Sequence, residues 1–203
     1  MKLTRREDLR RIYAEPSRRS LLKQMERLDS HCRRLISYSP LVIIGSVNAQ
    51  GQVDVSPRGG EPGFVKVLSD TELLLPDRSG NNRLDTLQNL LERPGLGMLF
   101  MVPGVDDTLR VNGTVRITAD AALLGPLELN GQAPPTGLLL EVHEVFLQCP
   151  KALMRARIWS PERRVPLGVL PTMGQMLADQ IEDRENKSAE EEATPSPGRE
   201  KSA

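Results

Sequence analysis

Aromatic residues, histidine and cysteine are scarce in this sequence. Only 3% of its 203 residues are aromatic, and it has two histidines and two cysteines. Cys32 and Cys149 lie far apart, which is not the framework of a disulfide-stapled secreted domain. They fit a reducing cytoplasm, where buried cysteine behaves as a small apolar residue. His31 and His143 form no zinc-ligand spacing, so we expect no metal site.

Long apolar runs and an excess of either charge are also absent. Lys+Arg and Asp+Glu both number 27, so no overall field attracts nucleic acid. A nucleic-acid-binding module built on the arginine-rich N-terminal region is disfavoured by this balance and by the few aromatics. No run is long enough to cross a membrane, and no apolar signal segment follows the first charges. We therefore expect a cytoplasmic protein.

Two common catalytic motifs are missing as well. The sequence contains no G-x-G-x-x-G dinucleotide fingerprint and no G-x-S-x-G nucleophile elbow. Strands are instead expected at short intervals, with one helix inserted at 82–92 and another at 150–159. The predicted strands are 41–47, 52–56, 64–68, 72–75, 96–102, 109–117 and 138–147. This order predicts a mainly β fold, a small antiparallel barrel with flanking helices, rather than a parallel doubly wound sheet.

The flanking regions divide the chain further. Residues 1–39 are expected to form N-terminal helices packing on the barrel, with Thr4 and Ser17 as caps and a break near Asp29. Their apolar stripe is Leu21, Met25, Leu28, Cys32 and Leu35. Residues 40–160 would form the barrel domain with its short C-terminal helix, and 161–181 an extension. The acidic tail, 182–203, is predicted to be disordered.

One stretch combines turns and cations as an anion site does. Ser56 and Arg58 stand in SPRGG at a strand end, and Asn81, Asn82 and Arg83 stand in GNNR at a predicted helix start. A helix start offers unpaired N–H groups and partial positive charge, so a cation there is unfavourable unless an anion is bound. The alternative is a plain helix start with an exposed arginine. The guanidinium at the preceding strand end favours a phosphate site.

The C-terminal helix supplies further candidates. Lys151 and Arg155 lie four residues apart and so share one helix face. That face is interpreted as a second anion contact or as a solvated basic surface. Trp159, the sole tryptophan, is interpreted as an anchor for this helix or as a ring stacked on a ligand.

Several motifs together carry a family resemblance. The segments SPRGG, PDRSGNNR and LRVNG, with LVIIGSV before them and LQCPKALMRARIW after them, resemble the pyridoxamine 5'-phosphate oxidase-like FMN-binding flavoproteins. The resemblance covers roughly residues 9–161. It implies a six-stranded antiparallel split β-barrel of the FMN-binding type. It further implies a homodimer with FMN in clefts between the subunits.

The resemblance also implies cofactor-binding residues. In the oxidases a Ser-Arg-Lys triplet opening this helix holds the flavin phosphate; Asn81, Asn82 and Arg83 stand at the corresponding positions here, and Arg58 adds charge. The flavin ring would lie along 64–68, against Phe64, Val65 and Pro76, with Arg110 from a partner strand closing the cleft. Together with Ser56, Lys151 and Arg155, these are the predicted FMN contacts.

The expected function is that of an FMN-dependent oxidoreductase acting on an unknown small molecule. Flavin carries the electron chemistry itself, which explains why no acid–base constellation is visible and why the catalytic residues stay unassigned. The alternatives are a non-catalytic flavin-binding or sensor protein, or a split barrel that uses deazaflavin or haem. Oxidases of vitamin B6 end in a pattern with arginine and histidine. No histidine follows His143, so the resemblance does not extend to that substrate.

Overall fold

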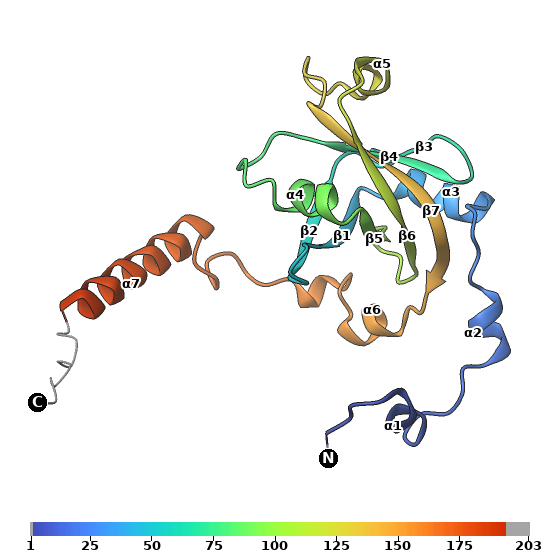
Figure 1. Ribbon diagram of the computed structural model, residues 1–203, viewed down its shortest axis with the longest axis horizontal. Coiled ribbons are helices and arrows are strands. Elements are labelled where there is room, and N and C mark those ends of the chain that lie inside the picture. Colours follow the sequence, from blue (N-terminus) through green and yellow to red (C-terminus); the bar gives the residue numbers. More distant parts are fainter. Residues whose placement is uncertain (1, 194–203) are drawn as a thin grey trace, which may run out of the picture. The chain divides into compact units, whose positions relative to one another are not determined.

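The computed structural model describes residues 2–193, and the side-chain environments of residues 2–185. The chain forms two compact units, Met1–Trp159 and Ser160–Ala203. The first unit is mainly β with flanking helices (Figure 1). Within the described range, no helix is both long enough and apolar enough to cross a bilayer.

One antiparallel sheet of seven strands organises the first unit. Its order is β2-β1-β5-β6-β7-β4-β3, and β2 and β3 do not pair with each other, so the sheet is not closed. The seven predicted strand positions are confirmed, although the resemblance implied six strands; the shortest, β3, has two residues. The strands are β1 (Leu41–Val47), β2 (Val53–Gly59), β3 (Lys66–Val67), β4 (Glu72–Asp77), β5 (Gly95–Met101), β6 (Thr108–Thr118) and β7 (Thr136–Gln148).

The two longest strands, β6 and β7, pair along their lengths with one irregularity. The register shifts between Asn112 and Gly113, which is a β-bulge. Position 113 has no room for a side chain, because a Cβ atom there would overlap the carbonyl oxygen of Glu141. Glycine is therefore the residue that lets the two strands approach at the bulge.

The inner face of the sheet holds the hydrophobic core. Strand β1 alternates, with Val42 and Ile44 fully buried and Ile43 partly exposed. Its continuous apolar run predicted burial on both faces, but one face of β1 remains half-open in the isolated chain. On the neighbouring edge strand, Val53 and Val55 are 73% and 65% exposed on that same outer face.

Helices flank this sheet. They are α1 (Arg6–Arg10), α2 (Arg18–Leu22), α3 (Ser30–Tyr38), α4 (Asp85–Glu92), α5 (Ala121–Leu124) and α6 (Lys151–Ala156), with the 3-10 turn η1 (Gly125–Leu127). The predicted caps Ser17 and Asp29 accept backbone N–H bonds from Ser20 and Cys32. Helix α3 buries Cys32 and Ile36 in the core, whereas α1 and α2 bury no residue.

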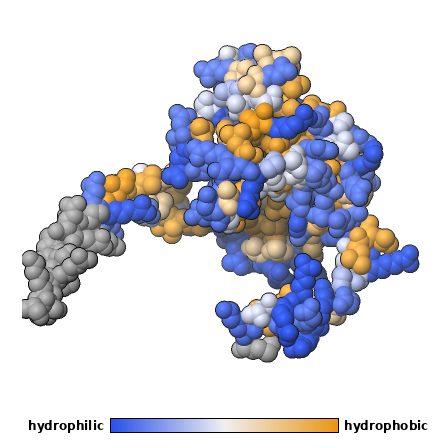
Figure 2. Space-filling model, viewed as in Figure 1, coloured by the Kyte–Doolittle hydropathy of each residue, from blue (hydrophilic) through white to orange (hydrophobic). Residues whose placement is uncertain are grey.

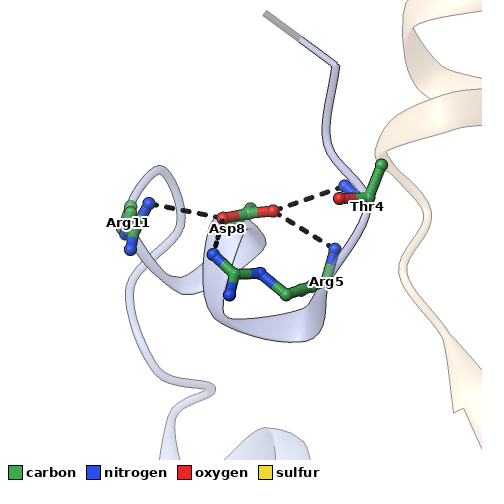
Figure 3. Close-up of polar contacts among 4 residues, drawn as sticks. All are labelled: Thr4, Arg5, Asp8 and Arg11. Atoms are coloured by element: carbon green, nitrogen blue, oxygen red, sulfur yellow. Dashed lines mark hydrogen bonds and ion pairs between the residues drawn. The ribbon is translucent and has the colours of Figure 1, made fainter.

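Helix α1 is held by local polar contacts. Asp8 accepts hydrogen bonds from the backbone N–H groups of Thr4 and Arg5 at 3.3 and 3.2 Å, and its other oxygen faces Arg5 and Arg11 (Figure 3). The N-cap position belongs to Arg5 rather than to Thr4, so the predicted Thr4 cap is wrong. The carboxylate of Asp8 satisfies the free N–H groups instead.

The second unit contains the 3-10 turn η2 (Pro161–Arg163) and helix α7 (Met173–Ala193). Exposed apolar side chains lie on the first half of α7, where apolar colour is visible in Figure 2: Met173, Met176, Leu177 and Ile181. Residues 182–193, part of the tail predicted to be disordered, have helical backbone, which suits their many Glu residues. The remainder of that predicted tail, 194–203, lies outside the described residues.

Candidate functional site

A cavity of about 670 Å³ lies where β2, the end of β4 and the start of β7 meet the loop that leads into α4. Five of the residues predicted from the sequence line it together: Ser56, Arg58, Asn81, Asn82 and Arg83. Asp77, Arg78, Leu84, Asp85, Thr86, Leu87, Pro135 and Thr136 complete most of the lining. The volume is in the range of small-molecule and cofactor sites.

Helix α4 begins later than its sequence predicted. It starts at Asp85, and Leu84 occupies the N-cap position with a left-handed backbone and no side-chain cap. Asn82 is left-handed too, and Asn81 Oδ1 accepts the N–H of Arg83 at 3.1 Å. Asparagine tolerates this backbone region, which explains a turn where a helix was predicted. Arg83 therefore precedes the first helical turn.

Arg83 is already paired in the structure. Its Nε lies 2.8 Å from Oδ2 of Asp85, and both side chains are largely exposed, at 72% and 47%. This contact raises the pKa of the Arg83 guanidinium. The pairing removes the local misfit that pointed to a bound anion, because Asp85 supplies the negative charge at the helix start.

Arg58 sits deeper in the cavity wall. Its Nε lies 3.6 Å from Oδ1 of Asp77, with side-chain exposures of 25% and 15%. Its Nη2 donates to Thr86 Oγ1 at 3.4 Å, and Thr86 donates in turn to Asp54 Oδ2 at 2.6 Å. The guanidinium of Arg58 is therefore oriented from two sides, by β4 and by α4. Burial raises the pKa of Asp77, and the facing Arg58 counteracts part of that shift.

Two further polar residues, Thr136 and Arg78, line the cavity. Thr136 Oγ1 is buried and has no hydrogen-bond partner, the single such side-chain atom among the described residues. Buried hydroxyls are seldom left unpaired in proteins, so a partner supplied by a bound molecule is a natural explanation. Arg78, from the same loop, donates to the carbonyl of Leu127 at 3.1 Å. The lining thus holds three arginines against two aspartates.

Other predicted cofactor contacts lie outside the cavity lining. Phe64 and Val65 belong to the hydrophobic core, with 8% and 3% exposure, and Pro76 is buried next to Asp77. Lys151 and Arg155 are exposed on α6. Their proposed roles therefore stay predictions.

Arg110 and Trp159 make other contacts. Arg110 pairs with Glu144 at 3.6 Å and lies over the ring of Phe146. The indole N–H of Trp159 donates to the carbonyl of Val105 at 3.0 Å, which matches the anchoring interpretation. Neither residue lines the cavity. In the described part of the chain, no group of three or more potential ligands is placed to hold a metal ion.

The sequence interpretation missed Asp77, Arg78, Thr86 and Thr136. The first two were visible in the motif PDRSGNNR, where they follow a strand directly. Thr86 and Thr136 carried no such signal. Their positions depend on how α4 packs against β2 and on the pairing of Asp77 with Thr136 across β4 and β7.

Comparison with known proteins places the region that contains the sheet in a family. A family model described as pyridoxamine 5'-phosphate oxidase matches residues 28–149. Among curated proteins, no sequence gives a significant match.

Solved structures also align with this chain. HupZ of Group A Streptococcus aligns with 16% identity over 59% of this chain and 93% of its own, at a TM-score of 0.49. A putative pyridoxamine 5'-phosphate oxidase of Lactobacillus delbrueckii aligns with 20% identity over 60% and 95%, at 0.47. A pyridoxamine 5'-phosphate oxidase-related, FMN binding protein of Nostoc punctiforme aligns with 16% identity over 57% and 76%, at 0.35.

Proposed function

The chain belongs to the pyridoxamine 5'-phosphate oxidase family, and from this premise we propose that it is a flavoprotein whose cavity holds the phosphate of FMN. The observation that carries the proposal is a set of three arginines and one unpaired buried hydroxyl among the residues that line one cavity. Guanidinium groups bind phosphate through charge-assisted hydrogen bonds. The Thr136 hydroxyl can donate to a phosphate oxygen, which an apolar ligand cannot offer.

The residues present fit such a group. Arg58 donates to Thr86, which orients its guanidinium beside α4, so it loses little conformational entropy when it meets a phosphate. Arg78 and Arg83 belong to the loop that leads into α4, and Ser56 adds a hydroxyl. FMN, when bound, supplies the electron-transfer chemistry. The chain supplies charge complementarity and a fixed position for the phosphate.

The remaining parts of the proposal concern reaction and assembly. The protein acts as an oxidoreductase on a small molecule in the cytoplasm. Its open seven-stranded sheet is a variant of the split barrel. Two copies pack through the outer face of β1 and β2, where Ile43, Val53 and Val55 form an apolar surface. An apolar face of this kind is typical of an interface. The flavin ring then lies in the cleft between subunits.

The cofactor test is a visible absorbance spectrum of the purified protein, with the released cofactor identified by mass. Oxidised FMN in a ratio near one per chain supports the proposal. If the released cofactor is instead deazaflavin or haem, the assignment of FMN is wrong. Apo protein is titrated with FMN and with riboflavin, which lacks the phosphate, and equal affinities for both would contradict the phosphate site.

Catalysis and assembly need separate measurements. Anaerobic reduction of bound flavin by NADH or NADPH, followed by reoxidation, distinguishes an oxidoreductase from a flavin-binding protein without turnover. Light scattering after size exclusion gives the oligomeric state. Val55→Glu should yield monomers, whereas Leu91→Glu, at another exposed apolar position, on α4, should leave the mass unchanged. A monomeric parent protein would contradict the homodimer.

A further inference from the structure

The cavity contains its own competitor for a bound phosphate. Asp77 is the carboxylate that faces Arg58, and Arg58 is less exposed than Arg83, the other ion-paired arginine of the cavity. The two side chains are 25% and 15% exposed, and both line the cavity. A phosphate that binds Arg58 therefore lies beside the Asp77 carboxylate, which is already paired with that guanidinium.

Apart from Arg58, the groups around Asp77 offer little to stabilise its negative charge. The charged groups around it are Arg58 and Asp54 from β2, the neighbouring Arg78, and Arg83 with Asp85 at the start of α4. Arg78 donates to the carbonyl of Leu127, and Arg83 is paired with Asp85. On β7, the residue opposite Asp77 is the uncharged Thr136. Among the described residues, Arg58 is the cation within ion-pair distance of Asp77.

We propose that phosphate binding draws Arg58 away from Asp77 and that Asp77 takes up one proton from solvent as the ligand binds. The inference rests on the proposed phosphate site and names how that site is regulated. The balance is simple: the carboxylate gains a proton, the guanidinium keeps its charge, and no bond of the ligand breaks. The cavity wall exchanges an internal anion for an external one.

Two physical effects act in the same direction when the ligand enters. The like charge of the phosphate disfavours the Asp77 carboxylate, and the loss of Arg58 leaves that carboxylate without its counter-ion in a mostly buried position. Burial already raises the pKa of Asp77 before the ligand arrives, with Arg58 opposing the shift. The bound state therefore holds more protons than the free state, and by linkage the ligand binds more weakly as pH rises.

The phosphate group itself titrates with a second pKa of about 6, so the pH profile of one protein is not diagnostic. The informative quantity is the ratio of FMN dissociation constants for the parent protein and for Asp77→Asn, measured by flavin fluorescence at several pH values between 5.5 and 8. The asparagine keeps the shape of the side chain and cannot ionise. The ratio should rise with pH, by at most about tenfold per pH unit, because only the parent must protonate residue 77.

Calorimetry gives the proton directly. Binding enthalpies for FMN, measured in buffers with different ionisation enthalpies, should show proton uptake by the parent protein beyond that shown by Asp77→Asn. Asp77→Glu retains a carboxylate and should retain the uptake. Asp85→Asn is the matched control: it removes the more exposed carboxylate of the same cavity and should change affinity without abolishing the excess uptake.

The outcomes separate the two proposals. FMN binding with equal pH profiles and equal proton uptake in the parent and Asp77→Asn would overturn the proton exchange and leave the phosphate site standing. Failure of the folded parent to bind FMN at any pH would overturn the proposed function itself. If Asp77→Asn does not fold, Asp77→Glu decides: the inference is overturned if neither the parent nor Asp77→Glu takes up more protons than the change in protonation of the phosphate group itself requires.

Discussion

The hydroxyl of Thr86 donates to Oδ2 of Asp54 at 2.6 Å, and so ties helix α4 to the edge strand β2. The same hydroxyl oxygen accepts from Arg58 at 3.4 Å. One buried side chain thus fixes the helix, the strand and the arginine that faces the cavity. Both the stability of this corner and the position of Arg58 depend on it.

Thr86→Val should destabilise the fold by about 1–3 kcal/mol, because Asp54 loses a donor while the side-chain volume stays the same. Urea unfolding followed by circular dichroism measures the change. Thr86→Ser retains the hydroxyl and should cost less than the valine variant. Equal stability of the valine variant and the parent would show that the hydroxyl bond to Asp54 contributes nothing.

The arginines of the cavity should contribute unequally to FMN affinity. Arg58→Ala removes a partly buried charged contact worth roughly 1.5–3 kcal/mol, which weakens binding by about 10- to 150-fold. Arg83→Ala should weaken it only a few-fold, and less at high salt, since that side chain is exposed. Arg116→Ala, whose side chain pairs with Glu72 outside the cavity lining, is the control. Fluorescence titration measures the FMN affinity of all three variants. A larger loss for Arg83→Ala than for Arg58→Ala would show that the phosphate does not bind at Arg58.

The raised pKa of Asp77 has a sign that unfolding can test. Burial raises the pKa in the folded state above the ordinary value of 3.8. The associated stability is present below pH 3.8 and is lost as pH rises through the folded pKa. The melting temperature of the parent minus that of Asp77→Asn should therefore decrease as pH increases from about 3.5 upward. A difference that increases over this range would mean that Arg58 outweighs burial.

Gly113→Ala should be severely destabilising, by about 3 kcal/mol or more, because its Cβ overlaps the carbonyl oxygen of Glu141 in the bulge. The matched variant is Gly95→Ala at the start of β5, where a Cβ meets nothing within 4 Å. Thermal unfolding of the two variants makes the comparison. Similar melting temperatures would show that β6 and β7 separate easily at the bulge.

The two cysteines should differ in reactivity. Cys32 is 1% exposed, and burial raises the pKa of its thiol to about 11, whereas Cys149 is exposed. Because the thiolate is the reactive form, a thiol reagent at pH 8 should modify one cysteine per native chain and two after denaturation. Mass spectrometry of the digested protein identifies the site. Native modification of Cys32 would indicate that α3 opens readily.

Much of the fold was predictable because local chemistry decides it. Apolar runs placed the strands, and side-chain oxygens at Ser17 and Asp29 marked helix starts that the structure confirms. The cap expected at Thr4 was wrong because Asp8 reaches back to the same N–H groups. Competition between two nearby acceptors is not visible in a residue pattern.

The cavity was predictable only in part. SPRGG and GNNR identified two walls from cations beside turns, and the structure brings them together. The left-handed backbone of Leu84 had no sequence signal, since leucine rarely adopts it. Thr136 gave none either, because its place in the wall depends on long-range pairing between β4 and β7. A residue whose place in a site depends on strand register can be identified only from the folded structure.

The anchoring of Trp159 to Val105 also has a spectroscopic consequence. Since the chain has one tryptophan, its tryptophan emission comes from a single location, the junction between the segment after α6 and the turn after β5. Changes in that emission therefore report the detachment of one junction rather than an average over the molecule. Flavin absorbs where indole emits, so the same residue also gives a distance-dependent optical signal for cofactor loading.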